Sequence, residues 1–141
     1  MKIKSVALIG LMTTLLFLSC EMDDIEPDSS QEISQTLPSG QWRITEFVED
    51  GVDETSEFTG YLFSFNTNGT IQASKPGISE VVNGTWNTVI DDGKTELWLA
   101  FPNNAKFQEL NDDWYTIEMT TQRIRLEDDN DNFTDLLTFE K

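Results

Sequence analysis

The sequence predicts an all-β fold: an eight-stranded antiparallel up-and-down barrel with one short helical turn near residues 103–111. Three observations favour it. From Gly40 onward, short runs of aromatic and β-branched residues recur at a spacing of about 8–15 residues. Several runs alternate apolar and polar residues with the period of two that strands require. Turn sequences such as Asn68-Gly69 join them, and successive hairpins build an antiparallel meander.

The strands are expected at residues 42–47, 61–65, 70–73, 81–87, 96–101, 114–119, 122–127 and 133–140. Closure of this meander into a barrel removes the exposed edge strands, which would otherwise be open to pairing with other chains. A β-sandwich is the alternative, because alternation alone does not distinguish a sheet that closes from one that folds over.

The connection over residues 102–113 is too long for a hairpin turn, and loops of this length usually carry their own structure or a function. Phe107 and Leu110 are three positions apart, so one helical turn would place both on the same face. They would then either plug one end of the barrel and complete its core, or form a lid that gates a pocket.

The first 19 residues have the three parts of an export signal. Two lysines form a positive start, and residues 6–18 form a mostly apolar run that is too short to span a membrane. Ser19 directly before Cys20 resembles the lipobox of bacterial lipoproteins, although Phe17 stands where Leu is usual. We therefore expect cleavage after Ser19 and acyl chains on Cys20. An ordinary signal peptide with a chance cysteine is the alternative.

Cys20 is the one cysteine of the sequence, so no disulfide is expected inside the mature domain. Several acyl chains on one residue bind a membrane stably. Glu21, Asp23 and Asp24 follow it and resemble the surface-export signal of some Gram-negative lipoproteins. We expect a lipid-anchored protein of the outer membrane, and the sequence leaves open whether it faces the cell surface or the periplasm. A generic acidic tether is the alternative meaning of these acidic residues.

Three regions are expected: a signal peptide at residues 1–19, a lipidated cysteine with a flexible acidic tether at residues 20–38, and a β-barrel domain at residues 39–141. The tether is predicted from its content of Asp, Glu, Ser and Gln and from two prolines. A short helix over residues 30–36 is the alternative for part of it, because Ser29 and Glu32 have the spacing of a capping box.

The chain is strongly acidic, with a net charge of −17 that becomes −19 when the signal and its two lysines are removed. Phosphate backbones repel such a chain, so nucleic acid is not expected as a partner. Solubility explains most of this charge, and the domain is expected to be monomeric.

The residue types that carry most catalysis are missing. The sequence has no histidine, which excludes histidine bases, triads and metal ligands, and the single cysteine is expected to carry lipid. Paired carboxylates remain for hydrolysis, but the acidic residues fall mainly in turns and in the tether. We therefore expect no enzymatic activity and no cofactor.

One acidic segment has part of a calcium-binding pattern. Asp128, Asn130 and Asn132 match the first three ligand positions of an EF-hand loop. Phe133 and Phe139 stand where that loop needs Gly and Glu. The segment is therefore expected to be a polar turn, and no metal site is predicted.

Three short motifs resemble the lipocalin-like domains of bacterial lipoproteins. They are Gly40-Gln41-Trp42 at the first expected strand, Gly84-Thr85-Trp86 in the fourth, and Leu110-Asn111-Asp112-Asp113-Trp114 before the sixth. Gly-x-Trp at the first strand is the lipocalin hallmark, and the likeness covers residues 39–141. It implies a small lipocalin-like barrel, shallower than the classical members, whose interior holds side chains or one small ligand. It implies no particular ligand.

The aromatic residues support two interpretations of the barrel interior. Six residues are expected to line a pocket for a small, partly apolar molecule: Tyr61, Phe63, Phe65, Trp86, Leu97 and Phe101. The same rings would equally serve to fill the core. The leading hypothesis is ligand binding at the barrel mouth. The alternative is an interaction module that binds a protein or an envelope glycan on an exterior face marked by Trp98, without a cavity.

Overall fold

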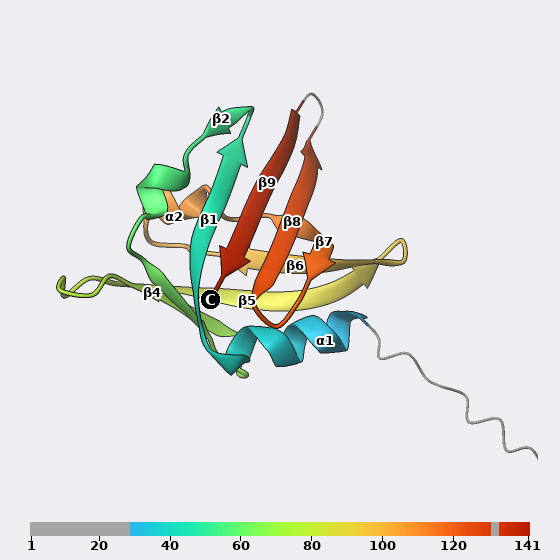
Figure 1. Cartoon of the computed structure of the whole chain (residues 1–141), viewed down its shortest axis with the longest axis horizontal. Coiled ribbons are helices and arrows are strands. Elements are labelled where there is room, and N and C mark those ends of the chain that lie inside the picture. Colours follow the sequence, from blue (N-terminus) through green and yellow to red (C-terminus); the bar gives the residue numbers. More distant parts are fainter. Residues whose placement is uncertain (1–28, 131–132) are drawn as a thin grey trace, which may run out of the picture.

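Among the described residues, 29–130 and 133–141, nine strands form one antiparallel sheet that closes on itself in this computed structural model (Figure 1). The strands are β1 (Gln41–Glu49), β2 (Val52–Asp53), β3 (Leu62–Phe65), β4 (Thr70–Ser74), β5 (Val81–Asp91), β6 (Lys94–Ala100), β7 (Asp113–Met119), β8 (Arg123–Asn130) and β9 (Phe133–Glu140). From β3 onward each strand pairs with the next, while β1 pairs with both β3 and β9. The predicted eight-stranded antiparallel barrel is therefore confirmed, and the pairing of β1 with β9 excludes an open sandwich.

The ninth strand, β2, lies outside the closed ring. It is a two-residue return that pairs only with the end of β1, after the turn at Asp50-Gly51. Two hairpins also differ in length from the prediction: the one formed by β5 and β6, and the one formed by β8 and β9. The hairpin of β5 and β6 is longer than expected, with its turn at Asp92-Gly93. Both turn residues have positive φ, 46° and 77°, which is the backbone form that an Asp-Gly pair favours between twisted strands.

The acidic segment expected to be a polar turn, residues 128–132, also differs in part. β8 continues to Asn130, and its pairing with β9 extends to Phe133. Residues 131 and 132 lie outside the described residues. Residues 128–130 of this acidic segment, which were expected in a turn, are therefore paired with β9 as part of strand β8.

Within the described residues, four helical segments accompany the barrel: α1 (Ser29–Thr36), the 3₁₀ helix η1 (Leu37–Ser39), the 3₁₀ helix η2 (Thr55–Phe58) and α2 (Ala105–Gln108). In the part of the chain that the structure describes, no helix combines the length and the apolar character needed to cross a membrane. The predicted signal peptide and Cys20 lie outside the described residues.

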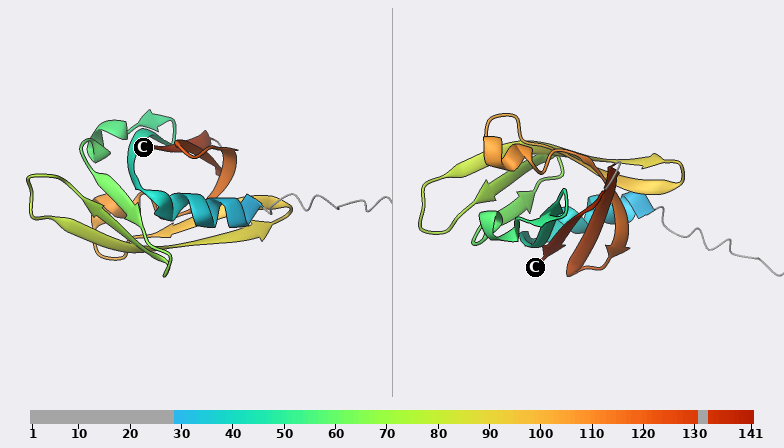
Figure 2. Two further views of the ribbon diagram at one scale, coloured as in Figure 1. Left: turned by 60° about the horizontal axis from the view of Figure 1, so that its bottom comes forward. Right: turned by 90° about the horizontal axis from the view of Figure 1, so that it is seen from above.

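The helix α1 lies across one end of the barrel (Figure 2). Ile33 of α1 and Leu37 of the following η1 are both fully buried in the core. The indole N–H of Trp42 donates to the backbone oxygen of Leu37 at 2.8 Å and so links this cover to β1. Residues 29–38, expected as part of a flexible tether, are therefore helical and packed against the barrel, because two apolar residues find a place in its core.

The other end of β1 leads to a second cover, made by η2 and α2. The helical turn expected near residues 103–111 is α2, and Asn104 caps it by accepting a hydrogen bond from the backbone N–H of Phe107 at 3.4 Å. Phe58 of η2 is buried, as are Phe107 and Leu110. Residues 102–113 thus supply a plug for the core, as the first of the two interpretations of this segment expected.

Candidate functional site

The six residues expected to line a ligand pocket come together, but as packed core side chains. Their exposed fractions are 8 % or less. The ring of Phe107 lies among them, with its centroid 5.1 Å from that of Tyr61 and 5.3 Å from that of Phe101. In the same core, Phe65 packs edge-on against Trp86, with ring centroids 5.6 Å apart. Side chains therefore occupy the place of the expected pocket, because the plug residue Phe107 fills the space between its walls.

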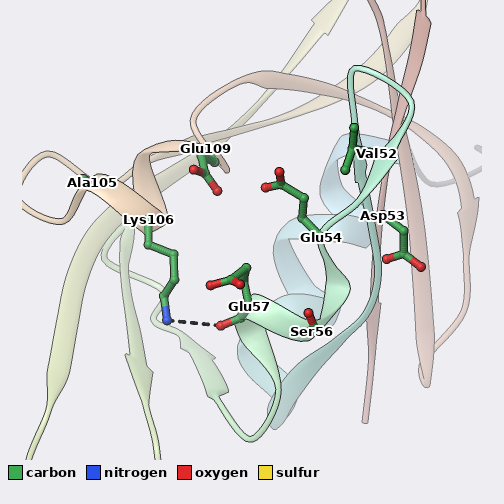
Figure 3. A pocket seen from close by; sticks show the side chains of 8 residues that line it. All are labelled: Val52, Asp53, Glu54, Ser56, Glu57, Ala105, Lys106 and Glu109. Carbon is green, nitrogen blue, oxygen red and sulfur yellow. Dashed lines mark hydrogen bonds between the residues drawn. The ribbon is translucent and has the colours of Figure 1, made fainter.

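A cleft of about 550 Å³ opens on the outer side of this plug, between η2 and α2 (Figure 3). Figure 3 shows the carboxylates of Glu54, Glu57 and Glu109 around it, with the amine of Lys106 on one side. Lys106 Nζ donates to the backbone oxygen of Glu57 at 3.1 Å and to Tyr61 Oη at 3.2 Å. This lysine therefore holds α2 against η2 along one side of the cleft.

Three carboxylates meet beside this cleft. Oxygen atoms of Glu49, Glu54 and Glu109 lie within 4.8 Å of one another. Partial desolvation raises the pKa of Glu109 above its ordinary value, and the charge of Glu54 raises it further. Desolvation followed by the charges of Glu109 and Glu54 likewise raises the pKa of Glu49. These oxygens are ligands of the kind that Ca²⁺ prefers. No sequence motif indicates the group, since its members come from three separate segments.

A different arrangement surrounds Trp98 on the outside of the barrel. Its side chain is 49 % exposed, and its indole N–H donates to Oε2 of the buried Glu96 at 2.7 Å. In the sheet, Trp98 stands between Asn87 of β5 and Asp113 of β7. Side chains opposite one another on neighbouring strands have Cβ atoms about 4.5–5.5 Å apart, so these two polar groups flank the indole. The outward position expected for Trp98 is therefore observed.

The same register places a second row of side chains next to this one. Glu96 pairs with Val89 of β5 and with Tyr115 of β7. We call the surface formed by both rows the Trp98 face; its members are Asn87, Val89, Glu96, Trp98, Asp113 and Tyr115. It combines two aromatic rings with two carboxylates and an amide.

The three other tryptophans of the chain are placed differently. Trp42, Trp86 and Trp114 are buried, and each donates its indole N–H to a backbone oxygen. The acceptors belong to Leu37, Asn66 and Leu110, at 2.8, 2.9 and 3.0 Å. These indoles therefore tie a helix or a connection to the barrel, whereas Trp98 is held by a side chain of its own strand and faces solvent.

The Trp98 face is electrically negative. Partial desolvation raises the pKa of the Tyr115 hydroxyl, and the charges of Glu96 and Asp91 raise it further. A side-chain hydrogen bond with Asp112, together with partial desolvation, raises the pKa of Asp113. Lys94 also lies against this face, with its Nζ 4.5 Å from the centroid of the Tyr115 ring.

Comparisons with known proteins support the architecture. No protein-family model and no curated protein matches the chain. Among solved structures, the chain is similar to a DUF4847 family protein from Bacteroides vulgatus, with a TM-score of 0.50 and 14 % sequence identity. The alignment covers 77 % of this chain and 96 % of that protein. At this identity the likeness concerns the fold alone, so the resemblance noted in the sequence is supported at the level of a barrel domain.

Proposed function

We propose that this protein is a lipid-anchored binding module of the outer membrane, which recognises a partner with the Trp98 face rather than inside the barrel. The observation that carries the proposal is the half-exposed, oriented indole of Trp98. Tryptophan is among the residues that most often dominate binding energy at protein surfaces. The filled interior favours the outer face over the barrel mouth, because Phe107 and its neighbours already occupy the mouth.

The hydrogen bond from Trp98 to Glu96 supports a binding role. Side chains that are already ordered lose less conformational entropy when a partner arrives, so their contacts contribute more to affinity. Glu96 is buried, so the acceptor is itself fixed by its surroundings. The indole is thus held in one orientation before binding.

The anchor is proposed from the sequence. Ser19-Cys20 after an apolar run supports lipidation at Cys20, and acyl chains there would fix the barrel to a membrane. The eight residues between Cys20 and Ser29 reach at most about 30 Å when fully extended, which would keep the barrel near the bilayer. A partner in the same envelope would then meet the Trp98 face at high local concentration.

The test compares the full chain with two variants, each produced in a Gram-negative host and purified in detergent. Immobilised protein is presented with separated envelope proteins and with envelope polysaccharides, and affinities are measured. Trp98→Ala is expected to lower affinity for the bound component about tenfold or more, as loss of a central aromatic anchor does. Ile78→Ala is the matched control, since Ile78 is 54 % exposed but lies in the connection between β4 and β5. Equal binding by both folded variants would contradict the proposal.

A further inference from the structure

Each lysine in the described part of the chain lies over an aromatic ring. The pairs are Lys75 and Lys106 on Tyr61, Lys94 on Tyr115, and Lys141 on Trp42, at 5.4, 4.3, 4.5 and 4.6 Å from the ring centroids. Within the same described residues, no lysine or arginine lies over Trp98. Cation–π attraction is strongest on tryptophan, so the exposed ring of Trp98 is available to a cation from another molecule.

The groups around Trp98 strengthen this preference. Glu96 accepts the indole N–H, and a carboxylate in that position makes the ring system richer in electrons. Asp113 lies opposite Trp98 across β6 and β7, with Asp112 as its neighbour in the chain. The raised pKa of Asp113 comes first from its side-chain hydrogen bond with Asp112, so two acidic side chains meet next to Trp98.

We propose that the partner of the Trp98 face is a basic protein segment, which places an arginine guanidinium on the Trp98 ring beside the carboxylate of Asp113. The inference rests on the proposed function, because it names the partner of that same face. A guanidinium is planar, so it stacks on an indole and at the same time donates two parallel hydrogen bonds to one carboxylate. The net charge of −17 would also steer a basic segment toward the domain.

A neutral glycan is the other ligand that stacks on exposed tryptophan rings. Asn87 would serve it as a hydrogen-bonding group on the β5 side of the ring. A neutral sugar gains nothing, however, from the negative charge of Asp113 and its surroundings. The charge therefore favours the basic segment, and glycan binding becomes an outcome of the test.

The experiment follows the indole N–H signals of the ¹⁵N-labelled full chain in detergent micelles. The four tryptophans give four signals, and Trp98→Phe identifies the one that belongs to Trp98. Three probes are titrated: a hexapeptide of alternating arginine and glycine, the matched glutamate–glycine peptide, and neutral maltohexaose. We expect the arginine peptide to shift the Trp98 signal and leave the three buried indoles in place, with an affinity that falls as salt rises.

Variants separate a cation–π contact from plain apolar contact or general charge. Trp98→Phe is expected to keep part of the affinity for the arginine peptide, and Trp98→Leu to lose about fivefold or more, because leucine has no π face. Asp113→Asn is expected to weaken binding of that peptide. Glu109→Gln, which removes one charge at the cleft beyond the plug, is the control and is expected to leave affinity unchanged.

Each contrary result has a definite meaning. Equal affinity of Trp98→Leu and wild type would overturn the inference. So would peptide-induced shifts of the backbone amide signals of Glu49, Glu54 and Glu109 while the Trp98 indole signal stays in place. A shift of the Trp98 signal with maltohexaose and not with the arginine peptide would overturn it too, while leaving the Trp98 face as a binding surface. If none of the three probes shifts the Trp98 signal, this inference fails. The proposed function is tested separately, and it fails if Trp98→Ala binds the envelope components as tightly as the wild type does.

Discussion

The ring of Phe107 packs edge-on against the ring of Phe58, with centroids 5.4 Å apart and ring planes at 84°. The first residue belongs to α2 and the second to η2, two connections far apart in the sequence. Their contact closes one end of the barrel with side chains, as Ile33 and Leu37 close the end beneath α1. A barrel filled from both ends supports the proposal that a partner would bind to the outer surface.

Phe107→Ala is expected to lower the free energy of unfolding by about 3–5 kcal/mol, the usual cost of a buried Phe→Ala change. Phe107 is fully buried and contacts the rings of Phe58, Tyr61, Phe63 and Phe101, so its removal leaves a cavity that they cannot refill. Denaturant titration measures the change. Gln108→Ala, on the exposed side of α2, is the control. A loss below about 1 kcal/mol for Phe107→Ala would mean that the plug is not part of the folded core.

Gly84→Ala is expected to destabilise the barrel by about 1–3 kcal/mol through overpacking. A Cβ at Gly84 would lie 2.5 Å from the backbone oxygen of Ala100 and 2.7 Å from the Phe101 ring, which are not free to move away. Gly40→Ala is the matched control, because a Cβ there meets only the flexible end of Lys141 at 3.3 Å. Both glycines precede Trp by two positions, so thermal melts of the two variants would show whether the repeated motif has one structural role or two. Equal stability of the variants would contradict the difference in packing.

Ile33→Ala is expected to cost about 2–5 kcal/mol, because α1 contributes a fully buried side chain to the core. Gln35→Ala, on the exposed face of the same helix, is expected to change stability little. Chemical denaturation of the two variants gives the comparison. If Ile33→Ala unfolds at the wild-type midpoint, the helix is not required for the barrel and the domain begins after it.

The strands and their closure follow from local patterns, because the period of two and the turn residues are properties of neighbouring positions. The interior could be predicted only as two alternatives, with Phe107 and Leu110 as a plug or as a lid. The alternation of apolar and polar residues tells which strand side chains point into the barrel. It does not tell whether a residue from a distant connection fills the space among them. In this structure Phe107 fills that space. The helix α1 gives a weak signal because Ile33 is its one apolar residue, while Leu37 follows in η1.

The Trp98 face and the carboxylate cluster beside the cleft also differ in how far the sequence predicts them. Trp98 is predictable as an outward residue because it stands between Leu97 and Leu99 in one strand. Its flanking groups come from β5 and β7, and the strand register that brings them there is known only from the fold. The carboxylates of Glu49, Glu54 and Glu109 come from the end of β1, the start of η2 and the end of α2, so their approach has no signature in the sequence.

The approach of those carboxylates gives stability a pH dependence. The pKa values of Glu49 and Glu109 are raised in the folded chain, so folding is favoured by protonation and this contribution is lost as pH rises through the raised values. At neutral pH the repulsion is fully present. Glu109→Gln is therefore expected to raise the free energy of unfolding at pH 7 by about 0.2–1 kcal/mol, and the gain is expected to vanish near pH 4.

Denaturant titrations at several pH values measure this effect. Asp92→Asn, in the exposed β5–β6 hairpin turn, is the control for removal of one negative charge elsewhere. A gain for Glu109→Gln that is the same at pH 4 and pH 7, or the same as that of Asp92→Asn, would show that the carboxylates do not repel one another.

Cys20→Ser tests the anchor on which the proposed placement depends. Because thioether lipidation requires the cysteine sulfur, the variant is expected to lack acyl chains and to leave the membrane fraction, while its barrel stays folded. Fractionation of the producing cells gives the first readout, and the intact mass of the purified chain gives the second, since acylation of the wild type adds mass. Phe17→Leu restores the usual lipobox residue and is the control, expected to remain in the membrane fraction. If wild type and Cys20→Ser have the same fractionation and neither carries added mass, the leader is an ordinary export signal, and the Trp98 face would have to find its partner from solution without the local concentration that an anchor provides.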